Sequence, residues 1–179
     1  MAPTDPRLSD WFDRYRRPLV AYAAKMLGGD WAAAHDVTQE TFLRLCRTDI
    51  DKVENRIAAW LFSVCRTRVI DLRRTGHEST LDPSDLLAAD PRQPPPDGDL
   101  LAAESRQTLA EQIDTLSPRQ QEVVRLRFSG GLSYAEIAEV TGMTPGNVGF
   151  HLHAAIKQLR QLTIQDPPGQ HQPDQQQPV

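Results

Sequence analysis

The sequence predicts an all-α protein with two small helical domains joined by a flexible acidic linker. Apolar residues recur at helical spacing in both halves of the chain, whereas runs of alternating β-branched residues are few. Between the halves, the run Pro94-Pro95-Pro96 excludes a continuous helix or strand, because proline lacks the backbone donor and fixes φ. The chain has 179 residues, enough for two small domains, and its hydrophobic content of 39% is typical of a globular protein.

The net charge of -4 is unevenly distributed along the chain. Residues 1–74 hold thirteen basic and ten acidic side chains, whereas residues 75–104 hold one basic and seven acidic ones. The acidic, proline-rich segment is therefore interpreted as a linker. The last residues, rich in glutamine and proline, cannot bury apolar surface and are expected to be disordered. The predicted organisation is a domain at 8–75, a linker at 76–102, a domain at 103–162 and a tail at 163–179.

Composition also excludes several classes of protein. No apolar run approaches the ~20 residues that span a bilayer, so we expect no membrane insertion. The amino terminus lacks a basic segment followed by an apolar one, which argues against a secretory signal. Cys46 and Cys65 lie far apart and form no Cys-x-x-Cys pair, which argues against a disulfide scaffold or a zinc finger. A cytoplasmic protein with no metal and no cofactor is expected.

Three helices are expected in the first domain, at about 9–27, 31–47 and 57–74. Pro18 bends the first of them or marks a boundary. The second has one apolar face and one polar face, on which Leu43 is the single apolar residue. The residues expected to be buried on this helix are Ala34, Val37, Thr38, Thr41 and Leu45, with Phe42 at the edge. The corresponding stripe on the third helix is Ile57, Leu61, Val64, Cys65 and Leu72.

Four helices are expected in the second domain, near 103–115, 118–129, 134–141 and 145–162. The sequences from Ser117 to Gln120 and from Ser133 to Glu136 both match a capping box, in which the first and fourth side chains bond each other's backbone N–H groups. Thr144 before a proline is a further start signal.

The segment 132–144 has the spacing of a helix-turn-helix, with a small Ala138 at the helix crossing and Gly142 in the turn. A plain αα-hairpin is the alternative, and we favour DNA binding. On the last helix, Asn147 can pair with adenine and an outward Phe150 can contact thymine methyl groups. His151 and His153 lie about 200° apart around the helix, which argues against a shared metal.

Two stretches of this chain resemble the extracytoplasmic-function sigma factors, the smallest bacterial initiation factors of RNA polymerase. Residues 34–45 (AHDVTQETFLRL), Trp60-Leu61-Phe62 and residues 69–74 (VIDLRR) resemble region 2 of that family. Residues 116–160, which begin with LSPRQQ, resemble its region 4. The pair of stretches, in this order and at this separation, is specific.

The resemblance implies three sets of functional residues. The polar face of helix 31–47 would dock on the clamp helices of the polymerase β′ subunit through Asp36, Gln39, Glu40, Leu43 and Arg47. Helix 57–74 and the loop before it would open and hold the -10 element through Lys52, Asn55, Arg56, Trp60, Phe62, Arg66, Thr67, Arg73 and Arg74. The helix-turn-helix would read the -35 element through Tyr134, Thr144, Asn147, Phe150, His153 and Lys157.

The resemblance further implies core RNA polymerase, including its β flap, and promoter DNA as partners, with an anti-sigma factor as a possible third. The family usually has asparagine where this chain has Thr67, and more basic residues in its last helix, so we expect fewer phosphate contacts at the -35 element. A conventional helix-turn-helix regulator, which binds a palindromic operator without polymerase, is the alternative function. The sequence shows no nucleophile-base set or phosphate-binding glycine loop, so an enzyme is not expected.

Overall fold

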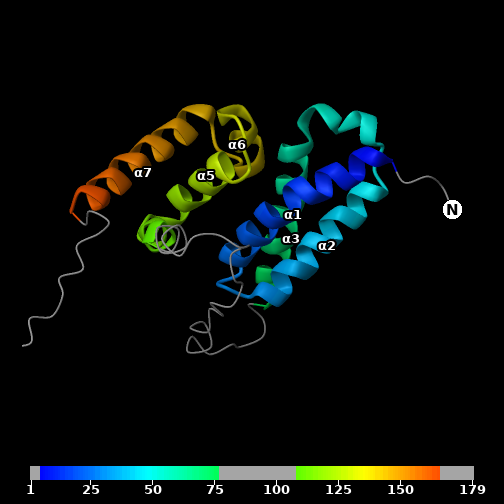
Figure 1. The fold of residues 1–179 in the computed structure, drawn as a ribbon, viewed down its shortest axis with the longest axis horizontal. Helices are drawn as coiled ribbons and strands as arrows, with labels where there is room; N and C mark the ends of the chain where they lie inside the picture. The colour runs from blue at the N-terminus through cyan, green and yellow to red at the C-terminus, as the bar shows by residue number, and fades with distance from the viewer. Residues whose placement is uncertain (1–4, 77–107, 166–179) are drawn as a thin grey trace, which may run out of the picture.

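The computed structural model describes residues 5–76 and 108–165, which are helical apart from short connections (Figure 1). The expected linker and tail lie outside the described residues. Among the described helices, none combines the length and the apolar character needed to cross a membrane. In the N-terminal half, the helices are α1 (Pro6–Met26), α2 (Trp31–Cys46) and α3 (Ile57–Gly76), with two 3₁₀ turns, η1 (Ile50–Lys52) and η2 (Glu54–Arg56), before α3. In the C-terminal half, a helical segment at 108–114 precedes α5 (Pro118–Phe128), α6 (Tyr134–Thr141) and α7 (Pro145–Gln165).

The helix starts follow the local signals in the sequence. Both predicted capping boxes are present, since Ser117 accepts from the N–H of Gln120 and Ser133 from that of Glu136, and each partner side chain bonds back. Gly142 ends α6 with φ of +73°, a left-handed conformation that a side chain would strain. The structure therefore confirms the expected helix starts at Ser117 and Ser133 and the expected turn at Gly142.

The N-terminal half is a three-helix unit in which α1, α2 and α3 pack against one another (Figure 1). The expected stripe on α2 is buried as predicted, and the hydroxyls of Thr38 and Thr41 donate to backbone carbonyls one turn earlier, at 2.8 Å. Pro18 lies inside α1 and does not end it. On α3, Leu61 and Cys65 are fully buried and Ile57 is 8% exposed, whereas Val64 and Leu72 of the expected stripe are only half-buried.

The C-terminal half forms the helix-turn-helix, with α7 packed on α5 and α6. Val148, Leu152 and Ala155 are buried on the inner side of α7. These positions lie four and three residues apart, as on one face of a helix, and the opposite side, with Asn147 and Phe150, is open to solvent.

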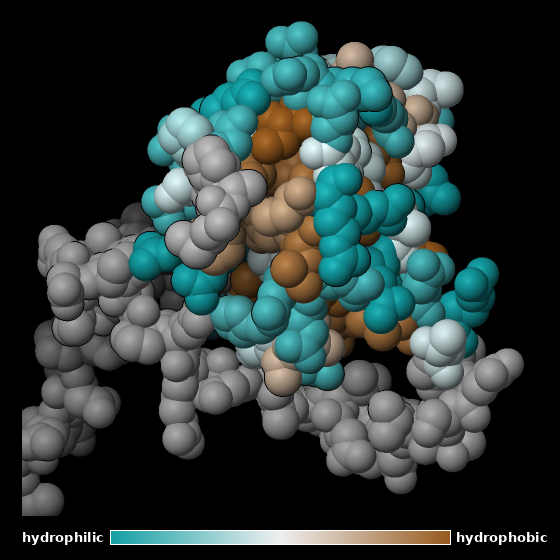
Figure 2. Space-filling model, turned by 90° about the vertical axis from the view of Figure 1, so that its right-hand side faces the viewer, coloured by the Kyte–Doolittle hydropathy of each residue, from teal (hydrophilic) through white to brown (hydrophobic). Residues whose placement is uncertain are grey.

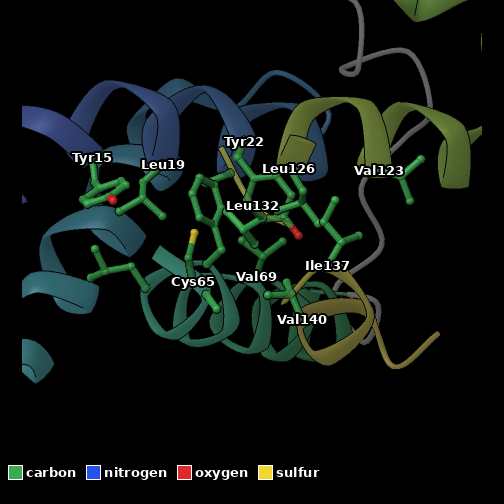
Figure 3. Packing of buried hydrophobic residues seen from close by; sticks show 14 of the residues in the cluster. Tyr15, Leu19, Tyr22, Cys65, Val69, Val123, Leu126, Leu132, Ile137 and Val140 are labelled. Atoms are coloured by element: carbon green, nitrogen blue, oxygen red, sulfur yellow. The ribbon is translucent and has the colours of Figure 1, made fainter. Parts of the chain in front are cut away.

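The two halves also pack against each other, which the sequence analysis did not foresee. The α3 helix lies against α6, and the buried residues of both halves belong to one continuous cluster. Figure 3 shows Tyr22 of α1 and Val69 of α3 pointing toward Leu126 and Leu132 of the C-terminal half. The hydrophobic core thus extends across the junction between the halves.

Burial of Cys65 predicts how stability depends on pH. Burial raises the pKa of this thiol from 9.0 to about 12, so above pH 9 the unfolded chain gives up a proton that the folded chain retains. The free energy of unfolding should therefore decrease as the pH rises from about 9 to about 12, by up to about 1.4 kcal/mol per pH unit. Denaturant titrations on both sides of pH 9 test this. The decline should be shallower in Cys65→Ala, and equal declines in the two proteins would contradict the assignment.

Candidate functional site

The outward face of α2 is a polar surface around one apolar side chain. All five residues predicted for this face are exposed, and Leu43 exposes 50% of its surface. Nearby on the same half, Phe12 of α1 is 40% exposed and its ring meets Phe42 edge to face at 4.9 Å. Figure 2, which looks onto one end of the molecule, shows that hydrophobic side chains also reach the surface there among hydrophilic ones. An exposed apolar centre with a polar rim is typical of a protein contact surface.

One residue of this face is held by a neighbouring helix. Glu40 accepts a hydrogen bond from Nε of Arg68 on α3, at 2.7 Å. The pair is solvent-exposed and contributes little stability, but it orients the Glu40 carboxylate on the face.

The loop before α3 carries three of the residues predicted for DNA. Lys52, Asn55 and Arg56 are all exposed on the 3₁₀ turns. Lys52 pairs with Asp49 at 3.1 Å, and the guanidinium of Arg56 reaches Glu139 of α6 at 2.8 Å. The structure therefore brings the C-terminal half against this loop.

The predicted residues of α3 divide into an exposed set and a covered set. Thr67, Arg73 and Arg74 are exposed, with the Thr67 hydroxyl donating to the carbonyl of Ser63 at 2.9 Å. Trp60 is half-buried at the edge of the core. Only the exposed set is available to a nucleic acid in this arrangement.

Phe62 and Arg66 form the covered set. Phe62 has no exposed surface and meets the ring of Tyr22 edge to face at 5.3 Å. Nε of Arg66 donates to Oε1 of Glu122 on α5 at 2.8 Å, and the hydroxyl of Tyr22 donates to the same oxygen at 2.9 Å. Burial acts to lower the pKa of Arg66, but the hydrogen bond and charge of Glu122 outweigh it and raise that pKa. Arg66 is thus a paired cation.

The six residues predicted for the -35 element all lie on the exposed side of the C-terminal half. Phe150 is 70% exposed and Tyr134 is 44% exposed. The hydroxyl of Thr144 accepts from the backbone N–H of Asn147 at 3.2 Å and so caps the start of α7. Asn147, His153 and Lys157 are exposed along the same helix. An aromatic side chain so open to water, beside amide and cationic groups, suits a DNA contact.

Gly149 lies in α7 under the ring of Tyr134, and this contact makes a testable prediction. A Cβ at Gly149 would lie 3.5 Å from Cε2 of Tyr134, an ordinary van der Waals contact. Because glycine in a helix interior costs backbone entropy, Gly149→Ala should raise the free energy of unfolding by about 0.5–1 kcal/mol. Thermal denaturation of the two proteins measures this. A lower melting temperature in the variant would show that the added methyl group disturbs Tyr134.

The sequence analysis missed several residues that join the two halves or lie beside a predicted site. Glu122, Glu139 and Asp114 of the C-terminal half all pair with basic residues of the N-terminal half. Arg127 lies with its guanidinium 5.8 Å from the ring centre of Tyr134, which adds a cation beside the predicted -35 surface. No local pattern in the sequence marks these contacts, because each depends on how separate helices pack.

Within the described ranges 5–76 and 108–165, no group of three or more His, Cys, Asp or Glu side chains is arranged to hold a metal ion.

Comparison with known proteins identifies both halves. Residues 11–78 match the family model of Sigma-70 region 2, and residues 106–159 match that of Sigma-70, region 4. The fold is similar to CnrH in the structure of its complex with the cytosolic domain of CnrY, with a TM-score of 0.58, 21% identity and coverage of 92% of each chain. It is also similar to the sigma factor RpoE of Bartonella quintana, crystallised with the anti-sigma factor NepR, with a TM-score of 0.54, 21% identity and coverage of 88% of this chain and 99% of that one.

Two relatives are similar over most of this chain. The ECF RNA polymerase sigma factor SigL of Mycobacterium tuberculosis is 35% identical over 157 residues, which is 87% of each chain. The ECF RNA polymerase sigma factor BldN of Streptomyces coelicolor is 32% identical over 158 residues, covering 87% of this chain and 60% of the relative. The chain therefore belongs to the ECF family of RNA polymerase sigma factors, non-catalytic proteins that direct RNA polymerase to promoters.

Proposed function

We propose that the outward face of α2 is the surface through which this sigma factor docks on the β′ clamp helices of core RNA polymerase. The observation that carries this proposal is the exposure of Leu43 at the centre of a polar face whose opposite side is buried in the core. The acidic and amide groups of Asp36, Gln39 and Glu40 give that contact its polar rim. The C-terminal half adds a second contact, to the β flap.

The loop at 50–56 and the adjacent face of α3 hold the -10 element in this proposal. Arg56, Arg66, Arg73 and Arg74 neutralise phosphates, and Trp60 with Phe62 provides an aromatic surface for an unpaired base. Unstacking a base costs a few kcal/mol, which contacts to an aromatic surface and to phosphates offset. Because the C-terminal half covers Phe62 and Arg66 when the two halves are packed together, this role requires the halves to separate.

The N-terminal end of α7 reads the -35 element. Asn147 and Phe150 are the residues that contact bases, while Tyr134, Thr144, His153 and Lys157 contact the backbone or flank the site. The proposed parts of the chain remain a domain at 8–75, a linker at 76–102, a domain at 103–162 that binds the -35 element, and a tail at 163–179. A cytoplasmic location and control by an anti-sigma factor fit this function, and the relative RpoE was crystallised with such a factor.

Reconstitution with polymerase tests the proposed function. Tagged sigma factor should co-purify with core RNA polymerase, and the resulting holoenzyme should start run-off transcripts at promoters that the core alone ignores. Footprinting of duplex DNA by the free protein, without any binding to core polymerase, would instead favour the conventional regulator.

The assignment of Phe150 makes a promoter-specific prediction. Phe150→Ala removes an exposed ring and should leave folding unchanged. It should lower run-off transcription from promoters that depend on a -35 element by about fivefold to a hundredfold, because a good base contact contributes about 1–3 kcal/mol. Templates that lack this element serve as the control. An equal loss on both kinds of template would contradict a base contact by Phe150.

A further inference from the structure

The junction between the two halves is built from ion pairs around an apolar centre. Arg66 of α3 and Glu122 of α5 are 26% and 16% exposed, and their side chains meet at 2.8 Å. Arg56 pairs with Glu139 at 2.8 Å, at the other end of the junction. Lys25 at the end of α1 supplies a third pair, with its Nζ 2.6 Å from Oδ2 of Asp114. In each pair the cation lies in the N-terminal half and the carboxylate in the C-terminal half.

The apolar centre brings the two halves into close contact. A Cβ at Gly130, between α5 and α6, would lie only 2.9 Å from Cε2 of Phe62 and 2.7 Å from Cδ1 of Leu132. Phe62 and Leu132 are both fully buried. Figure 3 shows the neighbouring Tyr22, Val69 and Leu126 pointing into the same centre. Packing of this density is that of a protein interior, so the junction is a specific contact.

From this geometry we infer that, in the free chain, the C-terminal half covers the -10 surface, which is the loop at 50–56 and the adjacent face of α3. We term this autoinhibitory contact the lock. The inference rests on the proposed -10 assignment and deepens it. The carboxylates of Glu122 and Glu139 occupy the guanidinium groups that DNA phosphates would otherwise bind, and the residues around Gly130 cover Phe62. DNA and the C-terminal half therefore compete for the same groups of α3 and its preceding loop.

The other two proposed surfaces stay open in the locked form. Leu43 and its polar neighbours on α2 are exposed, and so are Asn147 and Phe150 on α7. The locked chain can therefore dock on polymerase before it releases the -10 surface. Binding of the -10 element, which needs groups that the C-terminal half covers, then favours the separated state, since a ligand shifts an equilibrium toward the state it binds better.

A charge reversal at the buried pair tests the lock. Glu122→Lys places a cation against Arg66 and should separate the halves, because a like-charged pair cannot be held in a partly buried contact. Asp13→Lys, at an exposed position of α1, makes the same change of net charge and is the matched control. Glu139→Lys, at the more exposed pair with Arg56, is a second variant that is less demanding for folding. Circular dichroism checks that each variant keeps its helices.

The first measurement reports the arrangement of the halves. A carbodiimide joins an amine to a carboxylate only when the two touch, so the full-length wild-type protein and Asp13→Lys should yield a Lys25–Asp114 cross-linked peptide, detected by mass spectrometry. Glu122→Lys should yield little of it. Absence of this peptide from the wild type, or an equal yield from Glu122→Lys, would overturn the lock.

The second measurement reports access to the -10 surface. A fluorescent single-stranded oligonucleotide of mixed sequence should bind Glu122→Lys about tenfold more tightly than Asp13→Lys. This is the change expected when the fraction of molecules with an uncovered -10 surface rises from roughly a tenth to nearly one. Equal affinities of Glu122→Lys, Glu139→Lys and Asp13→Lys would overturn the lock. Run-off transcription by the wild-type holoenzyme tests the proposed function separately, because it needs no particular arrangement of the free chain.

Discussion

Phe62→Ala is expected to lower the free energy of unfolding by about 3–5 kcal/mol. The side chain has no exposed surface, and its ring packs edge to face on Tyr22 at 5.3 Å. Its ring also faces Gly130 of the C-terminal half, where an added Cβ would lie only 2.9 Å from Cε2 of Phe62. Removal of the ring therefore leaves a cavity shared by the core of the N-terminal half and the junction, which surrounding residues fill only in part.

Phe128→Ala is the matched control for this prediction. Phe128 ends α5 and is 67% exposed, so the same chemical change there should alter stability by less than about 0.5 kcal/mol. Denaturant unfolding followed by circular dichroism compares the two variants with the wild type. Similar losses in both variants would show that Phe62 is not part of a shared core.

The double substitution of Gln39→Ala with Leu43→Ala is expected to weaken binding to core RNA polymerase by a factor on the order of ten to a hundred. Leu43 is the apolar centre of the proposed docking face, and truncation of a central interface residue commonly costs about 1–3 kcal/mol. Both positions are exposed on α2, where alanine favours the helix, so helicity should not change.

Titration of labelled sigma factor with core polymerase measures the affinity. Leu109→Ala is the control, because Leu109 is 50% exposed, as Leu43 is, but lies outside α2. The control should bind as the wild type does. Unchanged affinity of the double variant would remove the docking assignment, while leaving the membership of the ECF family intact.

Much of the local structure was predictable because it depends on residues close together in the chain. The capping boxes at Ser117 and Ser133, the left-handed Gly142 and the buried stripe of α2 all appear where the sequence predicts them. The exposure of Leu43 and Phe150 was predictable for the same reason, since helical spacing alone assigns each to the face opposite the buried one.

The tertiary structure alone decided which predicted DNA-binding residues are accessible. Arg66 and Glu122 are separated by 56 positions, and Tyr22 and Glu122 by 100, so no periodicity could reveal that they share a hydrogen-bonding network. The sequence by itself determined the helices, their faces and the family. Packing of the C-terminal half on α3, through Glu122 of α5 and Gly130 after it, determined that Phe62 and Arg66 are covered while Arg73 and Arg74 are not, because burial at a junction depends on the shapes of both partners.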